Sequence, residues 1–252
     1  MVFSRSSSPV SGNMWRYRRW EAIAGVGTAH LYGDIGGYSR GSNGLGFKDI
    51  SFKNIRFNVN GSLSYMINSD FSLRLGVNVT GLHASDVKGS NESRALESST
   101  FMVEPDLLAE YNVIKSSFDG VLLFSGRRKF NIINLLNSFS VYGFAGLGSS
   151  IFKVDHNTSP TAGGTYSNGG VAMVFPAGAC LNLSWNSRMN FGVELAVRYA
   201  LSDYIDGYHS RYSKSNDIWH TITFTYSYKL KTGPRGWPSF ARSGIGELNR
   251  RR

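Results

Sequence analysis

Residues 57–79, FNVNGSLSYMINSDFSLRLGVNV, alternate apolar and polar side chains almost without interruption. Phe57 and Val59 fall on one face of an extended chain, whereas Asn58 falls on the other. This period of two is typical of a β-strand whose faces meet different surroundings. Residues 68–70, Asn-Ser-Asp, interrupt the pattern before it resumes. The stretch therefore predicts two antiparallel strands joined by a tight turn.

The same alternation recurs along the chain and predicts eight strands. At 12 to 16 residues each, they all exceed the five to six residues usual in soluble sheets. They are long enough to cross the apolar layer of a membrane at a tilt. The predicted strands are 20–33, 54–67, 71–83, 101–114, 138–153, 171–185, 190–201 and 217–230, the tight turns are 68–70 and 186–189, and the long connections, rich in Gly, Ser and Asn, are 34–53, 84–100, 154–170 and 202–216.

One connection departs from this scheme. Residues 115–137, KSSFDGVLLFSGRRKFNIINLLN, stand where a short turn is expected, yet they contain two apolar runs around a basic cluster, Arg127, Arg128 and Lys129. We predict a short helix or an ordered lid at this rim, and an additional pair of strands is the alternative.

An even number of long strands with alternating short and long connections indicates an antiparallel outer-membrane β-barrel. We expect the apolar face of each strand to meet lipid and the polar face to fill the narrow interior. A barrel with an apolar interior and a wet exterior has the same period, but it would not gather ionisable residues on one face. Arginines and carboxylates on the inward face can form the pairs that buried charges require. The predicted interior charge cluster comprises Arg56, Arg74, Glu104, Asp106, Glu110, Glu194 and Arg198.

Aromatic residues gather towards the strand ends, as in the interfacial girdles of membrane proteins. Those expected near the short turns are Trp20, Tyr65, Phe71, Tyr111, Trp185 and Tyr228, and those nearer the long connections are Phe101 and Phe175.

The net charge of +10 is concentrated in two flanking segments. Residues 1–20 carry +4 and residues 229–252 carry +6, which leaves the region between them neutral. We divide the chain into a basic segment 1–19, a barrel 20–230 and a basic tail 231–252. Short turns and both termini of such barrels face the periplasm, so both basic segments are expected there. Basic segments bind anionic surfaces or acidic protein faces, and nucleic acid is excluded for an exported barrel. Candidate partner-binding residues are Arg16, Arg18, Arg19, Arg127, Arg128, Lys129, Arg235, Trp237, Phe240, Arg242, Arg250, Arg251 and Arg252.

Targeting and redox signals add little. The chain contains no run of eighteen apolar residues, so no transmembrane helix is predicted. Residues 1–20 lack the apolar core of a signal peptide. We therefore expect the export signal to lie outside these residues. The single cysteine, Cys180, excludes an intrachain disulfide.

The search for catalytic or metal-binding motifs predicts no enzyme, no cofactor and no metal. None of the five histidines has a partner at metal-ligand spacing, and GSNGLG at 41–46 lacks the lysine of a phosphate-binding loop. Two alternatives remain open. One is a lipid-modifying barrel enzyme that uses His220, and the other is an adhesin that binds through loops 34–53 or 154–170.

Three stretches carry a family resemblance: WEAIAGVGTAHLYGDIGG (20–37), VYGFAGLGSSIF (141–152) and FPAGACLNLSWNSRMNFGVELAVRYALSDYIDGY (175–208). They resemble β-barrel proteins of the Bacteroidetes outer membrane, in particular barrels of the type IX secretion system. The resemblance implies an integral outer-membrane barrel in contact with lipid and with the periplasmic lipoprotein ring of that system, PorK with PorN. It carries over no catalytic residues. The long tail after Tyr228 departs from many such barrels and favours a dedicated periplasmic partner.

Overall fold

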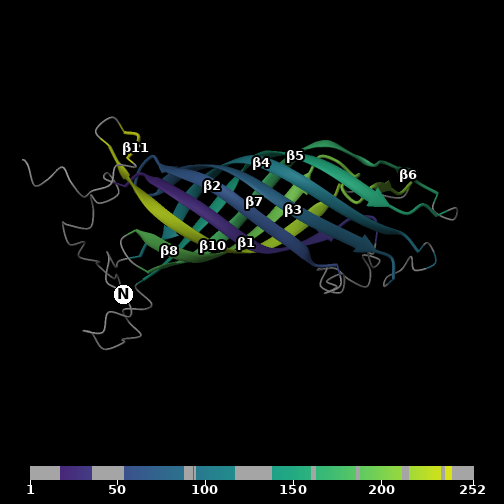
Figure 1. Ribbon diagram of the computed structural model, residues 1–252, viewed down its shortest axis with the longest axis horizontal. Helices are drawn as coiled ribbons and strands as arrows, with labels where there is room; N and C mark the ends of the chain where they lie inside the picture. Colours follow the sequence, from purple (N-terminus) through teal and green to yellow (C-terminus); the bar gives the residue numbers. More distant parts are fainter. Residues whose placement is uncertain are drawn as a thin grey trace, which may run out of the picture.

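A computed structural model describes residues 18–35, 54–87, 93, 95–116, 138–159, 163–185, 188–211, 216–233 and 236–239. Within these ranges, eight long strands form a closed antiparallel barrel (Figure 1), which confirms the predicted fold. The barrel strands are β1 (Trp20–Tyr32), β2 (Arg56–Met66), β3 (Phe71–Ser85), β4 (Glu97–Ile114), β5 (Phe139–His156), β7 (Gly169–Ser184), β8 (Met189–Ala200) and β10 (Ile218–Thr232).

No helix in the described ranges has both the length and the apolar character needed to cross a membrane.

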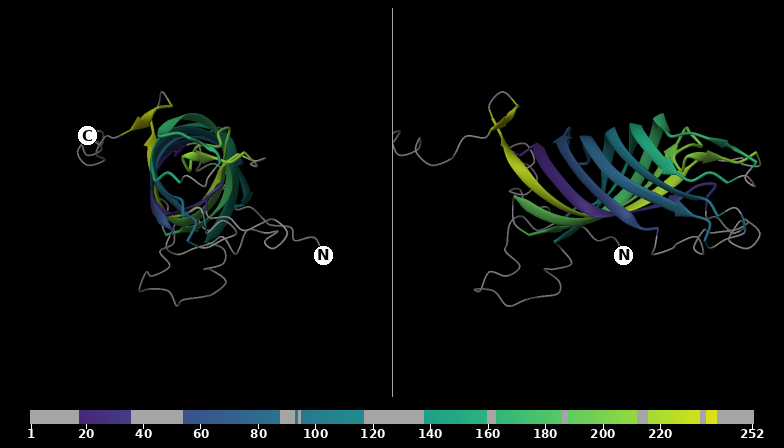
Figure 2. Two further views of the ribbon diagram at one scale, coloured as in Figure 1. Left: turned by 90° about the vertical axis from the view of Figure 1, so that its right-hand side faces the viewer. Right: turned by 45° about the vertical axis from the view of Figure 1, so that its right-hand side comes forward.

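The barrel closes between its first and last strands. Each barrel strand pairs with its neighbours in chain order, and β1 also pairs with β10 from Trp20 opposite Leu230 to Tyr32 opposite Ile218. Figure 2 shows the resulting ring in its left-hand view. Closure leaves no barrel strand with an unpaired edge, which an apolar environment would not tolerate.

The two ends of the barrel differ as the sequence predicts. At one end, here called the short-turn end, lie the turn 67–70, the end of β7 and the start of β8, the start of β1 and the end of β10. At the other end, the mouth, lie the connections between β1 and β2, β3 and β4, β5 and β7, and β8 and β10. The helix or lid predicted for 115–137 lies outside the described residues except for its first two.

Several strands extend further towards the mouth than the sequence predicts. β3 continues to Ser85 and β4 begins at Glu97, so both ends of the predicted connection 84–100 are strand. Likewise, β5 continues to His156 and β7 begins at Gly169. The outward positions here include Glu97, which is exposed. At the end of β5 the apolar residue Val154 points inwards and Lys153 points outwards, so the apolar face is opposite to that of mid-strand and the pattern fails to reveal these strand ends.

The exterior of the barrel is apolar. Leu75 and Phe224 are each 64% exposed, and Leu107, Met173 and Leu195 are exposed as well. The polar partners of these positions point inwards, so the alternative barrel with an apolar interior and a wet exterior is wrong. Arginine or lysine at the centre of a lipid-facing surface costs about 2–4 kcal/mol, which accounts for the uncharged outward positions at mid-strand.

Aromatic rings line the short-turn end as predicted. Trp20 packs on Tyr65 with ring centroids 4.8 Å apart, and Phe71 packs on Tyr111 at 4.9 Å. A third group joins Trp185, Phe191 and Tyr226. Amphipathic rings of this kind favour the boundary between lipid and water.

The mouth is closed by the connection between β8 and β10. Residues 201–211, here called the mouth plug, fold across the opening (Figure 2), and their short strand β9 (Tyr208–His209) pairs with β6 (Thr165–Tyr166). Ile205 of the plug is fully buried. This is unexpected for a connection with so weak an apolar pattern. The apolar cluster around Ile205 consists of Ala29, Leu31, Ile35, Leu82, Ala84, Leu96, Met102, Phe152, Val154, Ala172, Val174, Ala200, Tyr208 and Trp219.

Candidate functional sites in the barrel interior and at its mouth

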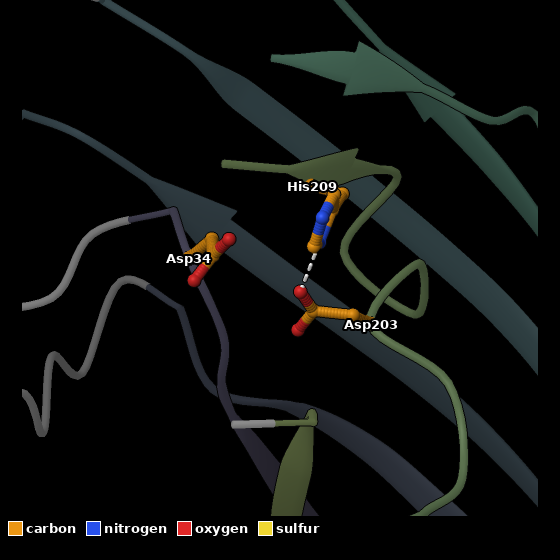
Figure 3. A group of neighbouring side chains, drawn as sticks. All are labelled: Asp34, Asp203 and His209. Atoms are coloured by element: carbon orange, nitrogen blue, oxygen red, sulfur yellow. Dashed lines mark hydrogen bonds and ion pairs between the residues drawn. The ribbon is translucent and has the colours of Figure 1, made fainter. Parts of the chain in front are cut away.

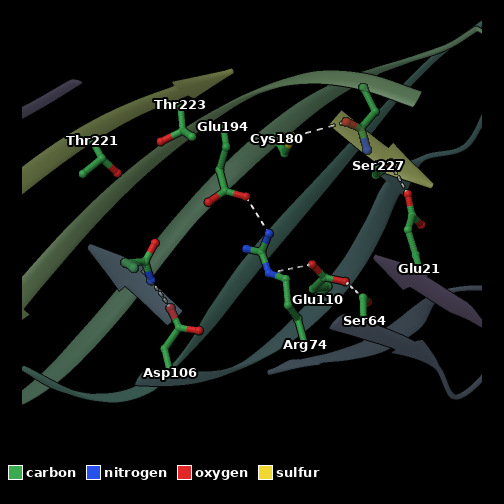
Figure 4. Close-up of polar contacts among 12 residues, drawn as sticks. Glu21, Ser64, Arg74, Asp106, Glu110, Cys180, Glu194, Thr221, Thr223 and Ser227 are labelled. Atoms are coloured by element: carbon green, nitrogen blue, oxygen red, sulfur yellow. Dashed lines mark hydrogen bonds and ion pairs between the residues drawn. The ribbon is translucent and has the colours of Figure 1, made fainter. Parts of the chain in front are cut away.

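Arg74 of β3 lies at the centre of the first interior charge network. Its side chain is 3% exposed, and its Nε and Nη1 contact Glu110 at 3.1 Å and Glu194 at 2.7 Å. Ser64 donates a hydrogen bond to the second oxygen of Glu110, and the guanidinium lies 4.8 Å from the ring centroid of Phe144. Figure 4 shows Arg74 between the two carboxylates. Alternate residues of strands β2, β3, β4 and β8 thus supply one buried, paired cluster.

Arg198 of β8 organises a second network nearer the mouth. Its Nε contacts Glu104 at 3.1 Å, and its Nη2 donates to the side-chain oxygen of Asn78 at 3.2 Å. Asn78 in turn donates to Asp106 at 2.8 Å, and Arg198 also donates to Thr221. The two networks bring together six of the seven residues proposed for the interior cluster.

Arg56 stands apart from these six. It is half-buried at the first residue of β2, where its Nη1 donates to the carbonyl of Ile55 at 3.0 Å. The period of two places it on the inward side, but its position at the strand end brings it to the mouth. Sequence reasoning also missed Glu21, a buried inward-facing carboxylate that accepts hydrogen bonds from Asn190 and Ser227.

The mouth holds a second group of polar residues, which was not predicted. It joins the Tyr32-Gly33-Asp34 corner after β1 to the mouth plug, two segments quoted above for the family resemblance. Asp206 accepts hydrogen bonds from the backbone of Asp34 and of Tyr208. Asp206 therefore ties the plug to the end of β1.

Asp217, just before β10, faces Asp206 from the other side. Its Oδ2 accepts hydrogen bonds from the backbone amides of Ile205 and Asp206. Burial raises the pKa of Asp206 to about 7. Burial, followed by the nearby charge of Asp206, raises the pKa of Asp217 well above its ordinary value. Two buried carboxyl groups side by side cannot both be ionised without a counter-charge.

Asp34, Asp203 and His209 form the more accessible part of this group. One ligand-type atom from each lies within 4.8 Å of the others, and Nδ1 of His209 contacts Oδ2 of Asp203. Figure 3 shows both carboxylates beside the imidazole. Pairing of β9 with β6 places His209 here. Spacing along the chain gave no signal of this convergence, because Asp34 lies far from the other two in sequence.

The short-turn end carries the described members of the predicted partner-binding set. The backbone amide of Arg19 donates to Thr232, and its guanidinium donates to Tyr65. Trp237 is 69% exposed and stacks on Trp20 at 6.3 Å. β11 (Pro238–Ser239) pairs with the end of β10, so the start of the tail folds back on the barrel. Arg18 also lies at this end. Outside the described residues lie Arg16, Arg127, Arg128, Lys129, Arg235, Phe240, Arg242, Arg250, Arg251 and Arg252.

His220, the residue proposed for lipid-modifying chemistry, faces outwards near the mouth end of β10. Its ring packs on Tyr32 at 4.7 Å, next to His30, which pairs with it across the strands. The side chain therefore belongs to an aromatic group on the outer wall rather than to the polar interior.

No protein-family model and no curated protein matches the chain. Among solved structures, the N-terminal β-barrel domain of Pseudomonas aeruginosa OprF matches with a TM-score of 0.43 and 13% identity over 84% of this chain and 98% of that one. Neisserial surface protein A matches with a TM-score of 0.43 and 11% identity over 84% and 97%. The outer membrane protein AlkL in lipid bilayers matches with a TM-score of 0.41 and 13% identity over 92% and 96%.

The fold rests on the chain itself, since these likenesses are distant. Its eight strands close into a ring, its exterior is apolar, and its charged residues at mid-strand are buried and paired. A soluble sheet does not expose a continuous apolar surface of this kind. The chain is an eight-stranded antiparallel β-barrel of the outer-membrane type.

Proposed function

We propose that this protein is a non-enzymatic integral outer-membrane barrel that docks a periplasmic protein assembly. The observation that carries the proposal is the filled interior. Buried ion pairs around Arg74 and Arg198 occupy the middle of the barrel, and the mouth plug lies above them. A barrel packed in this way serves as a rigid anchor rather than as a conduit.

The short-turn end is the docking face in this proposal, with both termini in the periplasm. Trp237 is exposed there, and the basic residues of the tail follow it. Exposed aromatic and arginine side chains are the residue types that dominate binding energy at protein interfaces. Their positive charge favours a partner with an acidic face.

The type IX secretion system is the assembly that the family resemblance suggests. Within the Bacteroidetes barrels, the chain is similar to PorG of that system, chiefly in the SDYIDGY corner and the basic extension. The partner is then the ring lipoprotein PorK with PorN.

Affinity purification from native membranes, followed by mass spectrometry, tests the proposal. Removing residues 240–252 leaves the pairing of β10 with β11 in place, so the barrel is expected to keep its heat-modifiable migration on gels. The ring proteins are expected to be lost from the purified material. Reversing the charges of Arg127, Arg128 and Lys129 tests the contribution of that segment in the same way.

Lys153 provides the matched control, because it is an exposed basic residue near the mouth end of β5. Lys153→Glu is expected to leave co-purification unchanged. If the ring proteins stay bound after both the truncation and the charge reversal, the docking proposal fails. A changed lipid A profile in a deletion strain, restored by the wild-type protein and not by a His220 variant, would favour the enzyme instead.

A further inference from the structure

The mouth contains a buried carboxylate oxygen that lacks a partner. Asp217 is 1% exposed. Its Oδ2 accepts two backbone hydrogen bonds, but its Oδ1 has no hydrogen-bond partner among the described residues. An unpaired buried carboxylate is unfavourable unless a positive charge or a proton compensates it. A proton compensates this atom while the carboxyl group is neutral, and a bound cation would compensate it once the group is ionised.

The unpartnered oxygen of Asp217 lies beside Gly33, as does one carboxylate oxygen of Asp206. A methyl carbon placed on Gly33 would lie 2.7 Å from Oδ1 of Asp217 and 2.6 Å from Oδ2 of Asp206. Gly33 directly precedes Asp34, whose carboxylate accepts a hydrogen bond from the backbone of Ser210 at 2.8 Å. Carboxyl groups from the residues after β1, from the plug and from the residue before β10 thus converge on one small region.

The outer side of this region offers three ligand-type side chains. The atoms of Asp34, Asp203 and His209 lie within 4.8 Å of one another. Ligands of a zinc ion at about 2.0–2.2 Å can be at most about 4.4 Å apart, so binding requires only a small contraction. Oδ1 of Asp203 also has no hydrogen-bond partner among the described residues. It is therefore available to a metal, which would replace the contact between Oδ2 and Nδ1 of His209 if that nitrogen binds the ion, because a metal-binding ring nitrogen has no proton to donate.

We propose that the mouth binds a divalent transition-metal ion, Zn²⁺ or Mn²⁺, through Asp34, Asp203 and His209, with the carboxyl groups of Asp217 and Asp206 behind it. Imidazole combined with carboxylates suits these ions, whereas Ca²⁺ prefers oxygen ligands throughout. The ion would join the end of β1 to the mouth plug and so hold the plug closed. This site is independent of the docking proposal, because it lies at the opposite end of the barrel.

Metal binding by the purified full-length protein in detergent micelles tests the inference. After dialysis against a chelator, the wild-type protein is expected to bind one equivalent of ZnCl₂ or MnCl₂ saturably by titration calorimetry, and CaCl₂ more weakly. Asp203→Asn and His209→Gln are each expected to reduce the affinity about 10-fold or more. Asp217→Asn, which keeps all three ligands, is expected to reduce it less.

His156→Gln is the control, because His156 is a second mouth histidine outside the proposed ligand set. It is expected to bind the metal as the wild type does, and heat-modifiable migration verifies that every variant folds. The inference is overturned if the wild type shows no saturable binding or if Asp203→Asn and His209→Gln bind equally well. A preference for Ca²⁺ would refute the assigned class of metal.

Discussion

Replacing Arg74 by methionine removes the positive charge at the centre of the first interior network and keeps a side chain of similar length. Glu110 and Glu194 would then stay buried without the guanidinium, which contacts them at 3.1 and 2.7 Å. Breaking a buried ion pair by removing one partner costs about 3–5 kcal/mol, because the remaining charge is left uncompensated. Arg74→Met is therefore expected to lower the free energy of unfolding by about that amount.

Urea unfolding of the barrel in lipid vesicles, followed by tryptophan fluorescence and by migration on gels, measures this loss. A triple variant that adds Glu110→Gln and Glu194→Gln removes the stranded charges and is expected to recover most of the stability. Lys115→Met is the control. Its partner Asp70 is solvent-exposed, and this variant is expected to leave the unfolding midpoint unchanged.

Two results would contradict this reasoning. If Arg74→Met unfolds at the same urea concentration as the wild type, the interior pairs do not stabilise the barrel. If the triple variant is as unstable as Arg74→Met, the loss comes from packing rather than from charge.

Three further predictions address closure, pH and lipid contact. Gly27→Ala would place a methyl carbon 2.0 Å from the carbonyl oxygen of Ile222, so it is expected to open the β1–β10 seam and abolish heat-modifiable migration. Gly61→Ala is the control, because the space around Gly61 is open, and it is expected to keep this migration. Burial raises the pKa of Asp206 from 3.8 to about 7, so in the presence of a chelator the plug is expected to be most stable below about pH 4 and to lose stability as the pH rises through 7. Hydrogen exchange of the plug, corrected for intrinsic rates, should become faster over this range, and slower exchange would refute the prediction. A spin label at Leu195, which is 54% exposed, is expected to be accessible to oxygen and shielded from water-soluble relaxants in vesicles, and the opposite accessibility would refute the lipid-facing exterior.

The alternation of residues 57–79 was enough to predict β2, β3 and their turn, because opposite faces of each strand meet opposite surroundings. The inward position of Arg74 and Glu194 follows from the same period. Where both faces of a strand carry polar residues, the signal disappears. The start of β4 was missed for this reason, since Glu97 and Ser99 are exposed and Ser98 is buried.

The period of the sequence also could not predict contacts between segments that are distant along the chain. Asp34 meets Asp203 and His209 only because the barrel closes and the plug folds inwards. Ile205 illustrates the same limit. A single apolar residue in a polar connection gives no periodic signal, yet it is buried at the centre of the mouth cluster.

The seam between β1 and β10 has a consequence for how the protein is made. β1 and β10, the first and last of the described barrel strands along the chain, are neighbours in the finished ring. Until the final strand is synthesised, the nascent chain has two edges whose amides and carbonyls are satisfied by water or by a chaperone. The closed barrel can therefore form in lipid only after β10 has been translated. A chain that ends before β10 keeps an open sheet with unpaired edges, which is prone to aggregation.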